Sequence, residues 1–181
     1  MNISKTSIYW FRQDLRLSDN PALSKALEND SVVVIYILDT INADQYFLGS
    51  ASRWWLHNSL LRLNDDLDNR LSVYKGDPES IINNLCKQYN TQSIYWNRCY
   101  EPWRINRDKN LKKNLQLNSI EVHTFNASLL WEPWEILKKD DTPYKVFSPF
   151  YKNGCLNSQL PKKPIKKPNL ENILTDKNNK N

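Results

Sequence analysis

Short apolar runs alternate with segments of helical periodicity along the first 125 residues. The clearest run covers residues 32–38, where seven apolar residues, most of them β-branched, stand in succession. Such a run is typical of a strand buried on both faces of a parallel sheet. Four further strands are predicted at residues 8–11, 71–74, 93–96 and 121–125. Intervening helices are predicted over residues 20–29, along the leucine stripe from residue 56 to 71, from 78 to 89 and over 102–117.

Five strands that alternate with helices predict an α/β fold, a doubly wound five-stranded parallel sheet with right-handed crossovers. Numbered along the chain, the strands are expected in the order 3-2-1-4-5. A ligand cleft is then expected between the carboxyl ends of strands 1 and 4, at the centre of the sheet. The fold is Rossmann-like but has no glycine-rich phosphate loop, because none of the three glycines lies in a GxGxxG or Walker A motif.

Polar side chains follow both strands that are predicted to be central. They are Arg12, Asp14 and Arg16 after the first strand, and Asn97, Arg98, Cys99 and Glu101 after the fourth. Glu101 is a candidate general base, but a carboxylate near arginines is more often an ion-pair partner. His57 and His123 lie in no triad-like context, and the three cysteines form no CxxC pair. We therefore predict neither a catalytic residue nor a metal site.

The net charge of +5 lies entirely in residues 151–181, because residues 1–150 carry 18 basic and 18 acidic side chains. A domain that binds nucleic acid directly carries a basic surplus, which the body of this chain lacks. Residues 161–168 alternate proline with lysine pairs, and the residues from 176 onward are expected to be disordered. We expect an α/β domain over residues 1–135 and a linker with a disordered basic tail over 136–181. The N-terminus lacks a signal-peptide core and no apolar run reaches 18 residues, which predicts a soluble, cytoplasmic protein without membrane contact.

Four blocks of sequence resemble, in order and spacing, the DNA photolyase/cryptochrome family. They are YWFRQDLRLSDNPAL at residues 9–23, ASRWWLH at 51–57, YWNRCYEP at 95–102 and PYKVFSPF at 143–150. The resemblance implies the N-terminal α/β domain of that family, which holds a light-harvesting antenna chromophore: a deazaflavin, a folate or a flavin. The catalytic FAD belongs to a larger helical C-terminal domain, which is expected to be absent from this chain.

The resemblance also implies, by position, an antenna cleft made of ten residues. They are Phe11, Arg12, Asp14 and Arg16 in one wall, Ile37, Leu38 and Asp39 in the floor, Arg53 reaching in from a helix start, and Asn97 and Glu101 at the closing edge. Cys99 replaces an acidic residue of deazaflavin-binding members, and Trp103-Arg104 replaces an Asn-Glu pair of folate binders. The identity of the antenna therefore stays open. The alternative is a surface ion-pair network around an empty cleft.

Two functional hypotheses follow from the resemblance. In the first, the chain is the antenna domain of a truncated or split deoxyribodipyrimidine photo-lyase, a family whose members repair pyrimidine dimers in DNA with light. Its partners are then the antenna molecule and a helical FAD-binding domain, in cis or in trans, and DNA is reached only through that domain. In the second, it is a stand-alone flavin-like chromophore module similar to a cryptochrome sensor, or a non-functional fragment. Alone, the chain is expected to be inactive in repair.

Overall fold

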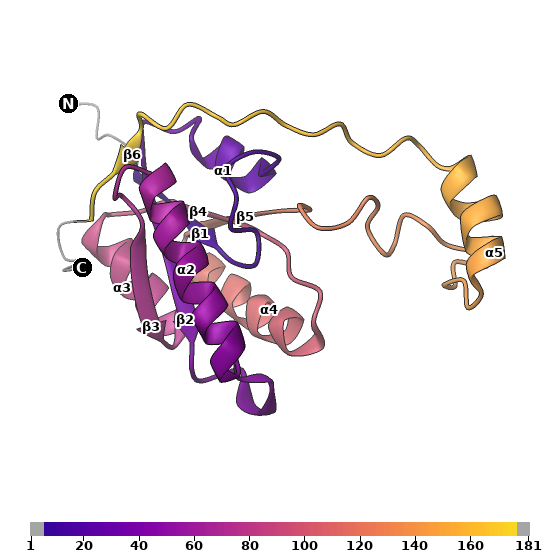
Figure 1. Ribbon diagram of the computed structural model, residues 1–181, viewed down its shortest axis with the longest axis horizontal. Coiled ribbons are helices and arrows are strands. Elements are labelled where there is room, and N and C mark those ends of the chain that lie inside the picture. The colour runs from indigo at the N-terminus through magenta and orange to yellow at the C-terminus, as the bar shows by residue number, and fades with distance from the viewer. Residues whose placement is uncertain (1–5, 177–181) are drawn as a thin grey trace. The chain divides into compact units, whose positions relative to one another are not determined.

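The computed structural model describes residues 6–176, and a parallel sheet forms the centre of the fold (Figure 1). Its main strands lie in the order β3-β2-β1-β4-β5, as predicted, and all adjacent pairs are parallel. A short sixth strand, not predicted, pairs with β2 at Val32 and Val33. The strands are β1 (Thr6–Phe11), β2 (Ser31–Asp39), β3 (Ser72–Gly76), β4 (Ser93–Asn97), β5 (Glu121–Phe125) and β6 (Ile173–Leu174).

Helices connect these strands within residues 6–127. They are α1 (Pro21–Ala26), α2 (Ser50–Asp66), α3 (Pro78–Gln88) and α4 (Pro102–Leu117), with a 3-10 turn at Asp44–Tyr46. α2 begins at Ser50, before the predicted leucine stripe, and ends at Asp66 rather than at residue 71. The Asn20 side chain accepts a hydrogen bond from the backbone N–H of Leu23, and Pro21 occupies the first helical turn. Asn20 thus pairs one backbone N–H group that the helix start would leave without a partner, and Pro21 has no N–H group to pair.

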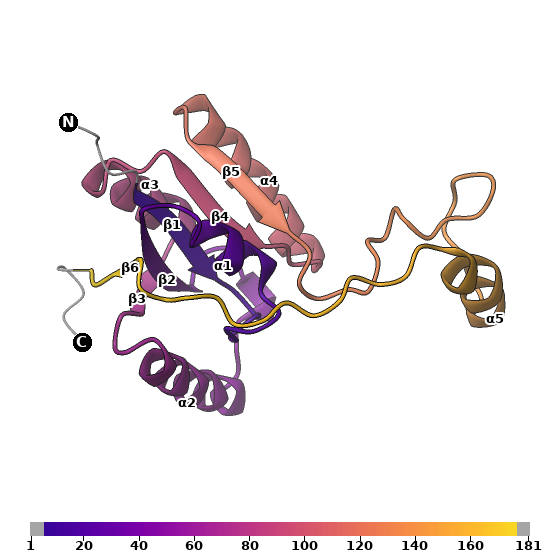
Figure 2. The same ribbon diagram turned by 90° about the horizontal axis from the view of Figure 1, so that it is seen from above.

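The two faces of the sheet are covered by different helices, as Figure 2 shows for α2 and α4. Tyr9, Phe11 and Val34 point to one face and pack with α1 and α2 residues such as Leu63 and Leu67. The alternate strand residues point to the other face, where the α3 and α4 side chains Ile82, Leu85, Leu111 and Leu115 cover them. The predicted continuous burial of the β2 run follows from this double coverage.

By its internal contacts the chain divides into two compact units, one from the N-terminus to residue 127 together with the residues from 165 onward, and the other over 128–164. The second unit contains α5 (Phe147–Pro149), a π-helical turn over Phe150–Gly154 and a 3-10 turn over Cys155–Asn157. The domain boundary that we placed after residue 135 stays a prediction.

The last described residues belong to the sheet unit. Ile173 lies buried against the α1–α2 face, and the Arg70 guanidinium donates to the carbonyl oxygens of Leu170 and Ile173. Disorder from residue 176 onward is wrong for Asp176 itself, because its buried carboxylate accepts hydrogen bonds from the hydroxyls of Tyr74 and Tyr89. Residues 177–181, for which we also expect disorder, lie outside the described residues.

Candidate functional site

A cavity of about 740 Å³ lies at the carboxyl ends of β1 and β2, between α2 and the first two turns of α4. The cleft was predicted one strand further along, between β1 and β4. At the end of β4, Asn97 is buried and donates to the side chains of Asp14 and Asn20. Six of the ten predicted residues line the cavity, namely Phe11, Arg12, Arg16, Ile37, Leu38 and Asp39.

Asp14 and Asn97 lie beneath the cavity as the centre of a buried network, and neither lines it. One Asp14 oxygen accepts from the backbone N–H of Arg12 at 2.9 Å, and the other accepts from the Tyr9 hydroxyl at 2.7 Å and from the Asn97 amide at 2.5 Å. Asn97 also donates to the Asn20 side chain at 2.7 Å. Burial together with the Asp14 carboxylate raises the pKa of Tyr9. The hydrogen bonds of these groups to one another hold the loop after β1 in place, so their role is structural.

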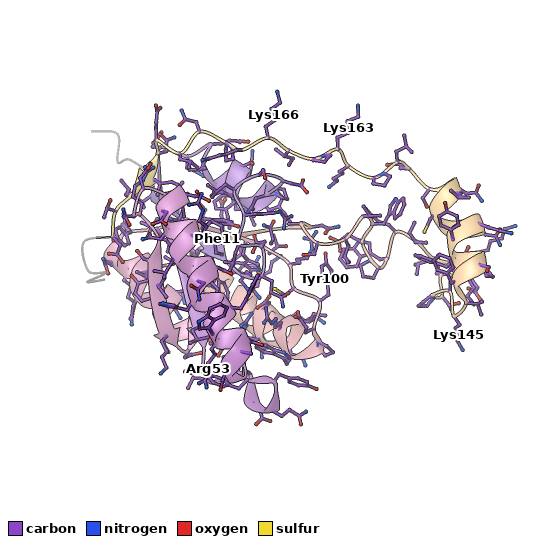
Figure 3. All side chains as sticks on the ribbon, in the orientation of Figure 1. Phe11, Arg53, Tyr100, Lys145, Lys163 and Lys166 are labelled. Carbon is purple, nitrogen blue, oxygen red and sulfur yellow. The ribbon has the colours of Figure 1, made fainter. Side chains whose placement is uncertain are left out.

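The other two predicted residues outside the cavity are Arg53, which is exposed, and Glu101, which is half-buried. Arg53 is exposed on the first turn of α2, with its guanidinium 5.8 Å from the centre of the Phe47 ring (Figure 3). Glu101 accepts a hydrogen bond from Gln13 at 2.7 Å and lies 3.7 Å from Arg104. Burial alone would raise the pKa of Glu101, but a backbone N–H, Arg104 and Gln13 outweigh it and lower that pKa. The geometry thus favours the ion-pair interpretation of Glu101 over the general base.

An ion-pair network of two arginines and two aspartates forms part of the cavity wall. Arg107 of α4 pairs with Asp39 and Asp108, and Arg12 pairs with the second Asp108 oxygen, each at 2.9 Å. Asp39 also accepts the backbone N–H groups of Ile41 and Asn42. Burial would raise the pKa of Asp39, but these donors and Arg107 outweigh it and lower that pKa. The carboxylate oxygens of Asp39 are therefore already used as acceptors within the protein, and Asp39 has a structural role in the floor of the cavity.

Two tryptophans stack with the arginines of this wall. The Arg12 guanidinium lies 4.1 Å from the centre of the Trp10 ring, and Arg107 lies between Trp10 and Trp103 at 5.0 and 5.2 Å. Arg104 lies 4.8 Å from the Trp103 ring. The α4 positions 103, 104 and 107 share one helical face.

Several polar atoms of the same wall are buried and have no hydrogen-bond partner within residues 6–176. They are the donors Trp10 Nε1, Arg12 Nη1 and Arg104 Nε. Buried polar groups in native proteins are nearly always satisfied, by other protein groups or by ordered water. The opposite wall is apolar and aromatic, with Leu38, Phe47 and Trp55 among its side chains. The arrangement suits a flat, partly apolar ligand that carries hydrogen-bond acceptors.

An open α/β sheet with such a cavity at the carboxyl ends of its strands is the architecture of a ligand-binding domain. The model of the DNA photolyase family matches residues 7–169, and the chain belongs to this family. The structure is similar to that of a bacterial class III photolyase from Agrobacterium tumefaciens, with a TM-score of 0.83 and 36% identity over 91% of this chain and 34% of that chain.

Two further relatives show how widely the resemblance extends. Cryptochrome-1 of Arabidopsis thaliana is 34% identical over 167 residues, 90% of this chain and 24% of its own length. An archaeal photolyase from Sulfolobus tokodaii, solved "with two FAD molecules: Implication of a novel light-harvesting cofactor", has a TM-score of 0.73 and 26% identity over 93% of this chain and 38% of that chain. The chain thus spans between a quarter and two fifths of the length of these relatives.

No helix within residues 6–176 combines the length and the apolar character that crossing a bilayer requires.

Proposed function

We propose that the cavity binds an antenna chromophore and that the chain is the light-harvesting domain of a photolyase-type protein. The observation that carries this proposal is a cavity of about 740 Å³ at the carboxyl ends of β1 and β2, lined by Arg12, Arg16 and Arg104 and by apolar and aromatic side chains. That volume lies within the usual range for cofactor sites, roughly 300–1,000 Å³. When bound, the chromophore supplies absorption of light and transfer of the excitation energy.

The residues of the cavity divide this task between a hydrogen-bonding wall and a stacking wall. Arg12 and Arg104 offer planar donors to carboxylate, phosphate or ring carbonyl oxygens. Phe47, Trp55 and Leu38 provide the apolar surface against which a flat ring packs. A deazaflavin, a folate and a flavin all combine these two features. The Sulfolobus tokodaii photolyase, whose second FAD implies a novel light-harvesting cofactor, supports the same role for this chain.

Repair or signalling by the family also needs the parts that the longer relatives contain. We propose that a helical FAD-binding domain, joined in cis or recruited in trans, completes the protein and that DNA is contacted only through it. The unit over residues 128–164 supports a partner of this kind, because Leu130, Phe147 and Leu160 expose 70%, 72% and 91% of their surfaces. Exposed apolar side chains at this density in so short a unit are typical of an interaction surface.

The test is an absorption spectrum of the purified chain after separate incubation with a reduced folate, a deazaflavin, FMN and FAD. We expect one visible or near-ultraviolet band to co-elute with the protein on gel filtration. The variant Ala51→Trp adds a large side chain at the cavity lining on the first turn of α2 and is expected to abolish that band. Gln116→Trp, on an exposed position of α4, is the matched control and should retain it. Retention of the band by Ala51→Trp would place the chromophore elsewhere.

A further inference from the structure

Tyr36 of β2 lines the cavity, and its side chain is nine-tenths buried. In the sheet, Tyr36 lies opposite Phe11 of β1 and Val73 of β3, and its ring belongs to the core cluster that contains Phe11. Its hydroxyl has no hydrogen-bond partner within residues 6–176 and is not fully covered, so it is open to the cavity. A hydroxyl on a cavity wall bonds to whatever fills the cavity, whether solvent or ligand.

Other uncharged donors of the cavity lining are less suited to hold a ligand. Gln13 and Ser59 already donate hydrogen bonds within the protein, at 2.7 and 2.9 Å. Tyr46 exposes 60% of its surface, and Trp10 Nε1 has no partner in the described residues but is fully covered. Tyr36 thus offers a ligand a donor that is held in the core of the sheet and is still reachable from the cavity.

The charged groups that act on Tyr36 belong to a wall whose charges cancel. Three guanidiniums are matched there by three carboxylates, namely Arg12, Arg104 and Arg107 by Asp39, Asp108 and Glu101. Burial raises the pKa of Tyr36, and the opposing effect of the three guanidiniums is smaller, so the hydroxyl keeps its proton at neutral pH. A neutral donor beside a wall without net charge favours an uncharged acceptor, because an anionic group would lose its hydration there without gaining a free counter-charge.

We propose that Tyr36 is a specificity-determining residue of the cavity, whose hydroxyl donates a hydrogen bond to a carbonyl oxygen on the ring of the ligand. The ligand class is a planar heterocycle with an amide-type carbonyl in its ring, bound with this uncharged edge toward β2 and with its charged tail directed away from Tyr36. This inference rests on the proposed antenna function and adds the residue that orients the ring. Because two neighbouring strands fix Tyr36 before a ligand arrives, the bond costs little additional ordering.

The experiment uses lumichrome and 6-methylpterin, the bare ring systems of a flavin and of a folate, which carry ring carbonyls and no charged tail. Dissociation constants of the full chain are measured by quenching of the ring fluorescence, and again with each of the four chromophores that co-elutes with the protein. Tyr36→Phe keeps the aromatic ring and removes only the hydroxyl, and it should weaken binding roughly threefold to tenfold. A hydrogen bond lowers the stretching frequency of a carbonyl group, so the infrared band of the bound ring should rise in this variant.

Tyr151→Phe is the matched control, because it removes the hydroxyl of a tyrosine that is 46% exposed in the other unit of the chain. It should change neither the affinity nor the carbonyl frequency, and inorganic phosphate should not displace the bound rings. An unchanged affinity or an unchanged carbonyl frequency in Tyr36→Phe, or displacement by phosphate, would overturn the proposal and leave the antenna function standing. Failure of every ring and chromophore to bind would remove both proposals together. Melting temperatures of the variants confirm that each is folded.

Discussion

Arg107 is expected to determine the stability of the cavity wall, and Arg107→Gln tests this. Its guanidinium is nearly buried and pairs with Asp39 and Asp108, both at 2.9 Å. Removing one partner of a buried ion pair costs about 3–5 kcal/mol, because the remaining charge stays buried without compensation. Here Asp108 keeps Arg12, and Asp39 keeps two backbone N–H donors, so the loss should lie at or below the lower limit, at about 2–3 kcal/mol.

The pH dependence of this loss identifies its origin. Because the folded protein lowers the pKa of Asp39, the carboxylate contributes stability above its ordinary pKa of about 3.9 and loses that contribution as the pH falls through the lower folded value. Arg107→Gln removes one cause of the lowering, so the pKa of Asp39 in the variant moves back upward. The difference in unfolding free energy between the two proteins should then be constant above about pH 5 and shrink below about pH 4.

Urea unfolding followed by tryptophan fluorescence, at about pH 7 and at intervals down to about pH 3, measures both effects. A loss of about 2–3 kcal/mol corresponds to a decrease in melting temperature of about 5–10 °C for a chain of this size. Arg62→Gln is the control, because it breaks an exposed α2 pair at 3.4 Å that is worth less than about 0.5 kcal/mol. A loss in Arg107→Gln no larger than in Arg62→Gln, or one that is unchanged at the acid end of the range, would refute the reasoning.

Two further substitutions test the buried parts that position the cavity. Asn97→Leu removes the amide that donates to Asp14 and Asn20 and should cost about 2–3 kcal/mol in urea unfolding; a loss below about 0.5 kcal/mol would contradict the role of Asn97 in the network. Asp176→Ala removes the acceptor of two tyrosine hydroxyls and should cost about 2 kcal/mol and speed amide exchange in β6, and unchanged exchange there would show that this contact does not hold the tail.

The strand order could be predicted from the sequence because β1, β2 and β4 contain continuous apolar runs and the strands alternate with helices, two of which begin with the side-chain caps Asn20 and Asp77. β6 could not be predicted in this way. Ile173 and Leu174 are the apolar pair of a segment otherwise rich in asparagine, and their partners Val32 and Val33 lie far earlier in the chain. Local composition indicated a linker there, whereas the pairing depends on an open position beside β2 that only the folded sheet provides.

The candidate site could also be predicted from the sequence only in part. Polar residues after a parallel strand either line a ligand site or form hydrogen bonds with buried polar groups of the protein. The residue type alone does not tell which of these roles a residue has. Arg12 and Arg16 line the cavity, but Asp14 and Asn97 are buried beneath it. Arg107 was missed because α4 is polar around most of its circumference and buries only Leu111 and Leu115 among its described residues, so the sequence pattern does not indicate which of its charges face the sheet.

Residues 12–16, in the loop after β1, contribute both to the stability of the fold and to the proposed ligand site. Asp14 anchors it to Tyr9 and Asn97 from below, and this anchor holds the flanking arginines at fixed positions. Arg12 is held by Asp108 with one amino group unpaired in the described part of the chain, and Arg16 is held by two carbonyl oxygens at the cavity. Because both guanidiniums are ordered before a ligand arrives, little side-chain entropy remains to be lost on binding. A substitution at Asp14 should therefore weaken ligand affinity without touching the ligand.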